Sequence, residues 1–165
     1  MKNILYFELS KEIDEMAAKD QLARAKYFNG EGEPDLELDK KNTTRLKEIV
    51  EEIGWPGISK VGPTSSNNAW LLAQHSDHDI AFQIECLTLM KAEQKNEVAQ
   101  KNIAFLEDRI LVNKGLPQIY GTQFKKDSFG KWLPKPIENR NDLNVRRLGM
   151  GLESFEEYET KINSM

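Results

Sequence analysis

The stretch IAFLEDRILV, residues 103–112, is apolar on almost every side of a helical turn, apart from the charges at its centre. A helix with this pattern is usually buried against several neighbours. We expect it to lie within a helix over residues 95–114, which Gly115 would end. Because a buried helix needs other elements packed around it, the stretch predicts a multi-helix core.

Five further segments show the three- and four-residue spacing of an amphipathic helix. In the first, Ile13 and Met16 recur on one face, and Gly30 would stop the helix. In the last, Ser154 and Glu157 have the spacing of a capping box. We expect these helices over residues 4–28, 43–53, 67–75, 77–91 and 154–162, with an irregular loop over residues 54–66.

After Pro117 the pattern changes to that of short strands. QIYGTQF, residues 118–124, and KWLPKPI, residues 131–137, predict two strands joined by the turn-rich link KDSFG. The prolines confine the second strand to an edge, and so small a ribbon must pack on helices. The sequence therefore predicts a mainly α fold. We expect a single compact multi-helix domain over residues 1–165, with a small two-stranded β-ribbon near the C-terminal third.

The composition restricts the class of protein. Of 165 residues, 39% are hydrophobic and 30% are charged, which suits a globular domain with its own core. The net charge of −4 predicts no nucleic-acid partner, although Arg146 and Arg147 leave a local basic patch open. The single Cys86 forbids an internal disulfide and fits a reducing compartment. Because no signal peptide or membrane-spanning run is visible, we expect a cytoplasmic protein.

Charged residues occupy helix positions where the spacing asks for apolar ones. Asp20 lies on the apolar stripe of the first helix, and Arg24 follows one turn later. They form either a surface pair or a pair that faces the interior. Asp108 and Arg109 interrupt the stretch 103–112, where an unpaired buried charge is strongly destabilising. They belong either to an ion-pair network that locks helices together or to a ligand site.

The segment QHSDHD, residues 74–79, concentrates titratable groups. One interpretation is a catalytic unit in which His75 carries a proton and Asp77 orients the ring. The other is local: a histidine is favourable at a helix C-terminus, and an aspartate caps the next helix. Neither a His-Glu-x-x-His motif nor paired cysteines are present, so a metal-free site without a cofactor is favoured.

Polar side chains also alternate along the first predicted strand. Gln118, Tyr120 and Thr122 would point to one face, and Gln123 to the other unless a bulge re-aims it. They are either solvated or form a wall of a pocket beside the buried helix. Further along, Arg146 is either a solvated charge or a clamp for phosphate or carboxylate.

These motifs together resemble an uncharacterised bacterial family, known only as a domain of unknown function. The shared elements are QHSDHD followed by FQ with Gln83, then FLEDRILV and PQIYGTQ, with DQLAR and GWP upstream and RR and GL downstream. The resemblance covers residues 20–158 and implies a bacterial protein with a largely helical fold, but no catalytic assignment. Gly57 departs from the family pattern, which expects threonine or a similar residue there, so no hydroxyl role is carried over.

Two classes of function follow. The first is an enzyme, a hydrolase or group transferase, that acts on a small polar or phosphorylated molecule in one hollow shared by these groups. His75 would be the general acid or base, and Asp77 or Asp108 would orient it. The candidate substrate-binding residues, which would hold a small polar or anionic ligand, are Asp20, Arg24, Gln83, Arg109, Gln118, Tyr120, Thr122, Gln123 and Arg146.

The second class is a non-catalytic protein that binds a small ligand or, as an immunity-type or regulatory protein, binds another protein. A pocket that contains His75, Asp108 and Tyr120 would favour chemistry or small-ligand binding. A filled core in which these groups pair with one another would mean that the charges serve only the fold.

Overall fold

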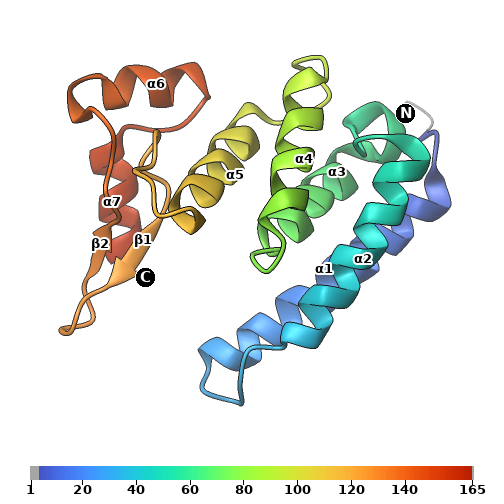
Figure 1. The fold of residues 1–165 in the computed structure, drawn as a ribbon, viewed down its shortest axis with the longest axis horizontal. Coiled ribbons are helices and arrows are strands. Elements are labelled where there is room, and N and C mark those ends of the chain that lie inside the picture. The colour runs from blue at the N-terminus through green and yellow to red at the C-terminus, as the bar shows by residue number, and fades with distance from the viewer. Residues whose placement is uncertain (1–3, 165) are drawn as a thin grey trace. The chain divides into compact units, whose positions relative to one another are not determined.

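The computed structural model describes residues 4–164, and this part of the chain contains seven α-helices and one small antiparallel sheet (Figure 1). The predicted mainly α fold with a two-stranded ribbon in the C-terminal third is confirmed. The chain forms two compact units, Met1–Ala99 and Gln100–Met165. Within residues 4–164 no helix is both long enough and apolar enough to span a bilayer.

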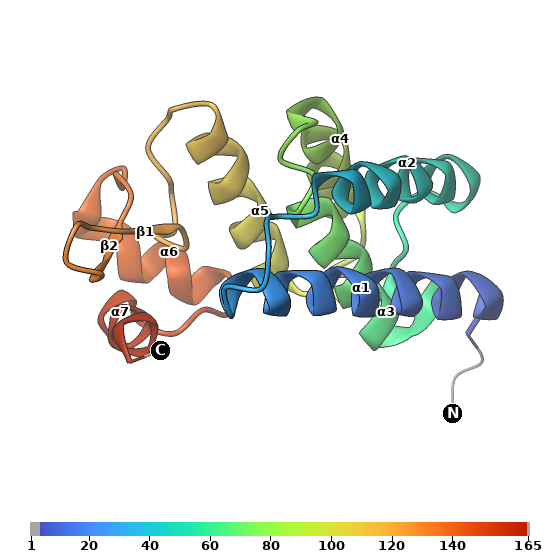
Figure 2. The same cartoon turned by 90° about the horizontal axis from the view of Figure 1, so that it is seen from below.

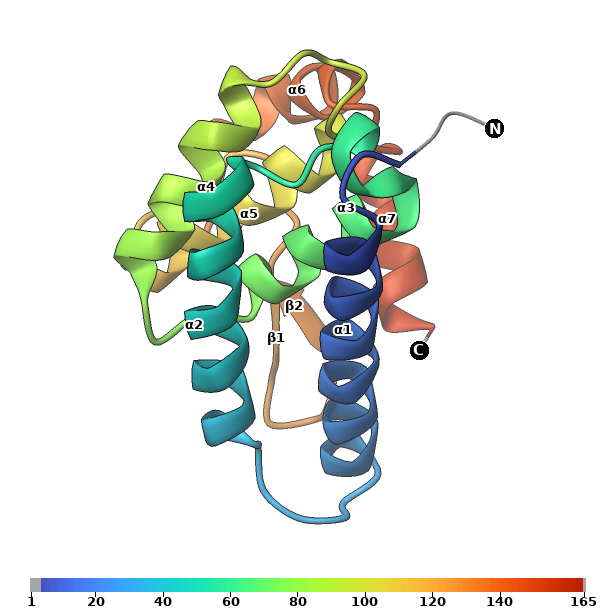
Figure 3. The same cartoon turned by 90° about the vertical axis from the view of Figure 1, so that its right-hand side faces the viewer.

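The first unit is helical and places α1 against two other helices. α1 lies along α3 (Figure 2) and beside α2, to which the loop 29–35 connects it (Figure 3). Burial of the inward faces stabilises this packing, and the most buried apolar side chains include Ile13, Leu46, Ile49, Val61, Ala69 and Leu72. The helices described in this unit are α1 (Phe7–Phe28), α2 (Leu36–Ile53), α3 (Ile58–Gln74) and α4 (Ile80–Ala92).

α2 begins at Leu36, so the predicted start near residue 43 is wrong. The Asp35 carboxylate accepts a hydrogen bond from the backbone N–H of Leu38 and caps the first turn. Residues 36–42 are mostly polar and contain no apolar repeat, which is why the spacing did not reveal them. The additional turns bring Asp39 to the side of α1.

α3 begins at Ile58, so the predicted loop over residues 54–66 is wrong beyond residue 57. Pro63 lies inside α3, directly after Gly62, whose φ of 84° and ψ of 163° interrupt the helical backbone. Proline suits the first turn of a helical segment because its missing N–H would have no partner there. The helix therefore resumes after a kink and continues to Gln74.

α4 is capped by Asp79 rather than by Asp77, the cap of the local interpretation. The Asp79 carboxylate accepts a hydrogen bond from the N–H of Phe82, and its other oxygen lies 2.6 Å from Nζ of Lys47 on α2. The residues between α3 and α4 therefore form a short link that starts at His75, the C-cap of α3.

The second unit combines helices with the β-ribbon. In the ribbon, β1 runs antiparallel to β2, with Lys125 opposite Leu133. The predicted capping box of Ser154 and Glu157 is present at the start of α7, which packs against α6 and β2. The elements of residues 100–164 are α5 (Gln100–Asn113), β1 (Phe124–Lys126), β2 (Trp132–Pro134), the 3-10 helix η1 (Arg140–Asp142), α6 (Leu143–Gly149) and α7 (Phe155–Asn163).

Both strands are much shorter than predicted. Each has three residues, because residues 119–123 fold as a loop and Gln118 forms only an isolated bridge to Ile137. Gly121 takes a φ of 69° in this loop, a conformation that breaks the regular alternation of a strand. The expectation that Gln118, Tyr120 and Thr122 share one face of a strand is therefore wrong.

Candidate functional site

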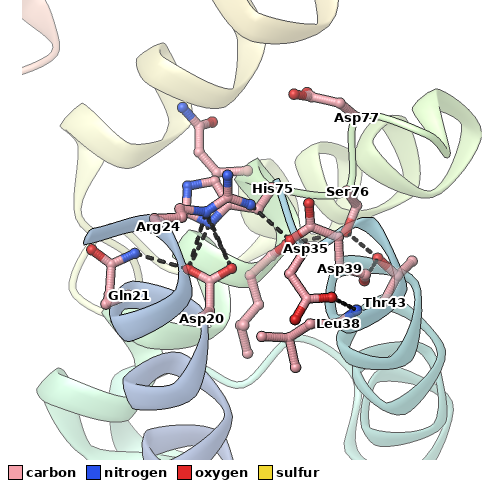
Figure 4. Close-up of polar contacts among 12 residues, drawn as sticks. Asp20, Gln21, Arg24, Asp35, Leu38, Asp39, Thr43, His75, Ser76 and Asp77 are labelled. Atoms are coloured by element: carbon pink, nitrogen blue, oxygen red, sulfur yellow. Dashed lines mark hydrogen bonds and ion pairs between the residues drawn. The ribbon is translucent and has the colours of Figure 1, made fainter. Parts of the chain in front are cut away.

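A buried aspartate and a histidine form the centre of the site in the first unit. Asp20 on α1 is 2% exposed, and its Oδ1 and Oδ2 lie 3.1 and 2.9 Å from Nδ1 of His75. The His75 side chain keeps 15% of its surface exposed. Figure 4 shows the imidazole directly above the carboxylate, so the packing of α1 on α3 brings the two groups together.

Nδ1 of His75 faces the Asp20 carboxylate. If Nδ1 carried a lone pair, that lone pair would point at a carboxylate oxygen 2.9 Å away, and the two acceptors would repel each other. In the tautomer that donates from Nδ1 to Asp20, the neutral ring keeps its lone pair on Nε2. Nε2 makes no hydrogen bond within residues 4–164. This is the arrangement of a histidine that can accept a proton.

Arg24 joins this pair to a second carboxylate. Its Nε lies 3.3 Å from both oxygens of Asp20, and its Nη2 donates to Oδ1 of Asp39 at 2.8 Å (Figure 4). Nε also lies 2.9 Å from Nδ1 of His75, which accepts this hydrogen bond only in the tautomer that carries its proton on Nε2. Arg24 and Asp20 are thus neither a surface pair nor a free anion clamp, but part of a cluster between α1 and α2.

The two carboxylates of the cluster differ in acidity. Burial by itself raises the pKa of Asp20, but the hydrogen bonds from His75 and Gln21 and the charge of Arg24 outweigh it, so its pKa lies below the ordinary value. Burial raises the pKa of Asp39, and Arg24 compensates only in part. Asp20 therefore remains ionised opposite His75.

A cavity adjoins the cluster at the end formed by α1, the loop 29–35 and the start of α2. It measures about 120 Å³. A wider hollow of about 280 Å³ lies next to it and shares Ala23, Asp35 and Leu38 with it. The smaller cavity is lined by Asp20, Ala23, Arg24, Tyr27, Phe28, Pro34, Asp35, Leu38 and Asp39.

Hydroxyl groups fix the residue that follows His75. Oγ of Ser76 lies 2.8 Å from Oγ1 of Thr43 on α2 and donates to the carbonyl of Leu72 on α3. Thr43 in turn donates to the carbonyl of Asp39. Sequence reasoning missed Asp35, Asp39 and Thr43 as part of the site. Their spacing of four residues would have placed them on one face had α2 been started at Leu36.

Asp77 and Gln83 do not contact the imidazole. Gln83 is fully buried, and its Nε2 lies 3.2–3.3 Å from the carbonyls of Ala73 and Gln74 and from Oδ1 of Asp77. Figure 4 shows Asp77 apart from the Asp20 carboxylate. The aspartate that binds Nδ1 is therefore Asp20, and Gln83 ties the end of α3 to α4.

In the second unit, Asp108 anchors a loop. Its fully buried carboxylate accepts hydrogen bonds from the N–H groups of Ile119, Tyr120 and Thr122 at 2.7–3.0 Å and from the Thr122 hydroxyl at 2.9 Å. Burial raises the pKa of Asp108, and these hydrogen bonds oppose the shift. Through these hydrogen bonds the Asp108 carboxylate stabilises the loop 119–122.

Gln118 is a second link within this loop. Its Nε2 donates to the carbonyls of Gln123 and Lys135 at 2.9 Å, and its Oε1 accepts from the N–H of Gln123 at 2.8 Å. The side chain of Gln123 donates to Oγ1 of Thr122. The Tyr120 hydroxyl lies 3.5 Å from Oε2 of Glu107, and burial raises the pKa of Tyr120 to about 12. These predicted ligand-binding groups hold the loop together.

The arginines of α6 also donate hydrogen bonds to this loop. Arg146 donates to the carbonyls of Ile119, Glu138 and Asn139. Arg147, for which the sequence left a local basic patch open, is buried and donates to the carbonyl of Tyr120 at 2.6 Å. Neither guanidinium therefore has the open geometry of a phosphate clamp. Arg109 is half-buried on α5.

The structure thus groups the candidates into two sets. Asp20, Arg24 and His75 meet in the first unit, whereas Asp108, Gln118, Tyr120, Thr122, Gln123 and Arg146 build the loop of the second. The expectation of one hollow shared by all of them stays a prediction. Within residues 4–164 no group of three His, Cys, Asp or Glu side chains is placed to hold a metal ion.

The chain belongs to a family of unknown function, DUF6624, whose family model matches residues 8–164. The resemblance to a domain family of unknown function is thereby confirmed, and the match extends beyond the motifs on which it was based. No curated protein and no solved structure matches the chain significantly.

Proposed function

We propose that this protein is an enzyme, a hydrolase or group transferase, that acts on a small polar molecule with His75 as general base. The observation that carries the proposal is the Asp20–His75 contact of 2.9 Å, in a cluster whose Asp20 and Arg24 side chains line the adjoining cavity. We include in the proposal a bacterial cytoplasmic location, which the single unpaired Cys86 supports.

The proposed chemistry is proton transfer through the imidazole. Nε2 takes a proton from water or from a substrate hydroxyl, and the oxygen attacks an electrophilic centre of the substrate. The imidazolium that forms is stabilised by ionised Asp20 and then returns the proton to the leaving group. Such catalysis contributes about 10²- to 10⁴-fold in rate.

The charges around the cavity favour an uncharged or cationic substrate over a phosphorylated one. Three carboxylates line the cavity, from Asp20, Asp35 and Asp39, against one guanidinium. Arg24 already pairs with Asp20 and Asp39. An incoming phosphate would therefore face more negative than positive charge.

The runner-up is a protein that binds a small ligand or another protein without chemistry. In its favour, Asp20 and Arg24 line the cavity directly, whereas His75 contacts it only through them. Exposed apolar side chains such as Phe28 and Leu36 nearby would suit a protein partner.

A generic ester tests the enzyme proposal without knowledge of the natural substrate. Hydrolysis of p-nitrophenyl acetate by the full chain is compared with that of His75→Ala and of Asp20→Asn. His78→Ala is the matched control, because His78 is exposed on the same link. We expect His75→Ala to lose roughly 100-fold in rate and His78→Ala to match the unaltered protein. Equal rates for His75→Ala and the unaltered protein would refute the proposal.

A further inference from the structure

We propose that the cavity lined by α1 and the start of α2 binds a ligand with an ammonium group on a short apolar chain. This inference rests on the proposed function, because it names the substrate class of the same site. Four features of the cavity support it: its charge, the helix ends beside it, its apolar wall and its size.

The first feature is the balance of charge around the two adjoining hollows. Five acidic side chains line them, against three basic ones, and Arg24 is already held between Asp20 and Asp39. A concave surface with this excess concentrates cations. The acids are Asp20, Glu31, Glu33, Asp35 and Asp39, and the bases are Lys19, Arg24 and Lys26.

The second feature is the orientation of the helix ends. Tyr27 and Phe28 belong to the last turn of α1, where the helix dipole is negative and favours a cation. The start of α2 would favour an anion, but Asp35 caps it and already binds the N–H of Leu38. Asp39 also has a raised pKa because it is buried and lies near Asp20, and a cationic ligand would relieve this.

The third feature is the apolar wall of the cavity. Tyr27 and Phe28 are 42% and 76% exposed, and their ring centroids lie 5.5 Å apart. Together with Pro34 and Leu38 they make up the apolar part of the cavity lining. Aromatic faces attract ammonium groups, and apolar side chains bury the methylenes that carry them.

The fourth feature is the size of the cavity. The inner cavity of about 120 Å³ equals roughly four water molecules at about 30 Å³ each. That space suits an ammonium head and a few carbons, and the wider hollow leaves room for the rest of a longer molecule. The chemical class is therefore a small alkylamine or the amine end of a larger substrate.

Three probes of equal chain length test the charge requirement. The full chain is titrated with n-butylammonium chloride, butan-1-ol and sodium butanoate, and binding is followed by backbone amide NMR shifts. We expect saturable shifts at Ala23, Phe28, Leu38 and Asp39 with butylammonium, with a dissociation constant of about 1–10 mM. The alcohol and the carboxylate should bind at least about tenfold more weakly.

Asp35→Asn is the decisive variant, because asparagine keeps the N-cap while removing the charge. We expect it to weaken butylammonium binding by about threefold. Glu37→Gln is the matched control, since Glu37 is 85% exposed, lies outside the cavity and should leave binding unchanged. Circular dichroism of both variants verifies that the fold is intact.

Three outcomes overturn the inference: no saturable binding of butylammonium, equal binding of butanoate, or equal weakening by Glu37→Gln. The same titration in His75→Ala separates the two proposals, because binding should persist there while ester hydrolysis is lost. Binding without any dependence of hydrolysis on His75 would leave a ligand site and reject the enzyme.

Discussion

Nδ1 of His75 lies 2.9 Å from Oδ2 of Asp20, although 55 positions separate the two residues in the sequence. The carboxylate is almost completely buried and carries additional hydrogen bonds from Gln21 and Arg24. A buried acid with this many donors fixes the orientation of the ring and remains charged. The stability of the fold, the pKa of Asp20 and the proposed chemistry of His75 therefore all depend on this contact.

Asp20→Asn should destabilise the fold in a pH-dependent way. The pKa of Asp20 is lowered in the folded chain. Its ionised form therefore stabilises the fold at pH values above the unfolded-state pKa, and this stabilisation is lost as the pH falls through the folded-state pKa. We expect a loss of about 2 kcal/mol in the free energy of unfolding near neutral pH. Urea unfolding near about pH 7 and about pH 3 should show the difference shrinking in acid. A difference independent of pH would contradict this assignment.

Asp39→Asn should behave in the opposite way, although Asp39 contacts the same arginine. The pKa of Asp39 is raised by burial, so its ionisation opposes folding. The unaltered protein therefore loses stability relative to the Asp39→Asn variant as the pH rises from the unfolded-state pKa of Asp39 through its folded-state pKa. An asparagine oxygen can still accept the hydrogen bond from Arg24. We expect stability near neutral pH to be unchanged or higher by up to about 1 kcal/mol. A loss as large as that of Asp20→Asn would disprove the distinction between the two acids.

Asp108→Asn should loosen the loop 119–122. The amide can replace only part of a carboxylate that accepts hydrogen bonds from three N–H groups and a hydroxyl, so some buried donors lose their partner. We expect a loss of about 3 kcal/mol. Hydrogen exchange at Ile119, Tyr120 and Thr122 should accelerate. Asp142→Asn, at an exposed position of the same unit, should stay within about 0.5 kcal/mol of the unaltered protein.

Gln83→Glu should disturb the end of α3. The substitution keeps the shape but turns the donor Nε2 into an oxygen that faces the carbonyls of Ala73 and Gln74. We expect a loss of about 2–3 kcal/mol in the free energy of unfolding, measured in urea. Ester hydrolysis should fall as well, because His75 directly follows the last residue of α3. Gln94→Glu, at an exposed position, serves as control, and similar losses in both variants would show that the charge alone is responsible.

Gly121→Ala should destabilise the second unit more than Gly130→Ala. Both glycines have positive φ, at 69° and 81°, so each alanine is strained in the backbone. At Gly121 the new Cβ would also lie 2.8 Å from Cε2 of Phe155, whereas at Gly130 nothing lies within 4 Å. We expect losses of about 3 and about 1 kcal/mol, measured by thermal or urea unfolding. Equal losses would mean that Phe155 moves aside without cost.

Features that depend on neighbouring residues could be predicted from the sequence. The helical spacing around Ile13 and Leu46 and the capping box at Ser154 reflect contacts within one or two turns, and the ribbon follows from its turn residues. The same local rules failed where a cap or a kink replaces periodicity. The start of α2 at Leu36 depends on one side chain, Asp35, and α3 continues across Gly62 and Pro63.

The site could be predicted only in part. Asp20, Arg24 and His75 stood out because each is polar at a position where a helix of this kind is buried or ends, and residue type is visible in the sequence. The sequence did not show which aspartate forms a hydrogen bond with which partner. Asp77 and Asp108 were plausible partners of His75 by type, yet their hydrogen bonds go to Gln83 and to the loop 119–122.

The sequence by itself determined that this is a mainly helical protein of the family matched over residues 8–164, with charged groups inside its helices. Only the tertiary structure decided that Asp20 binds His75, that Asp39 shares Arg24, and that Arg147 is buried. The physical reason is that hydrogen bonds between distant segments depend on how helices pack, and packing follows burial over the whole fold rather than any local pattern.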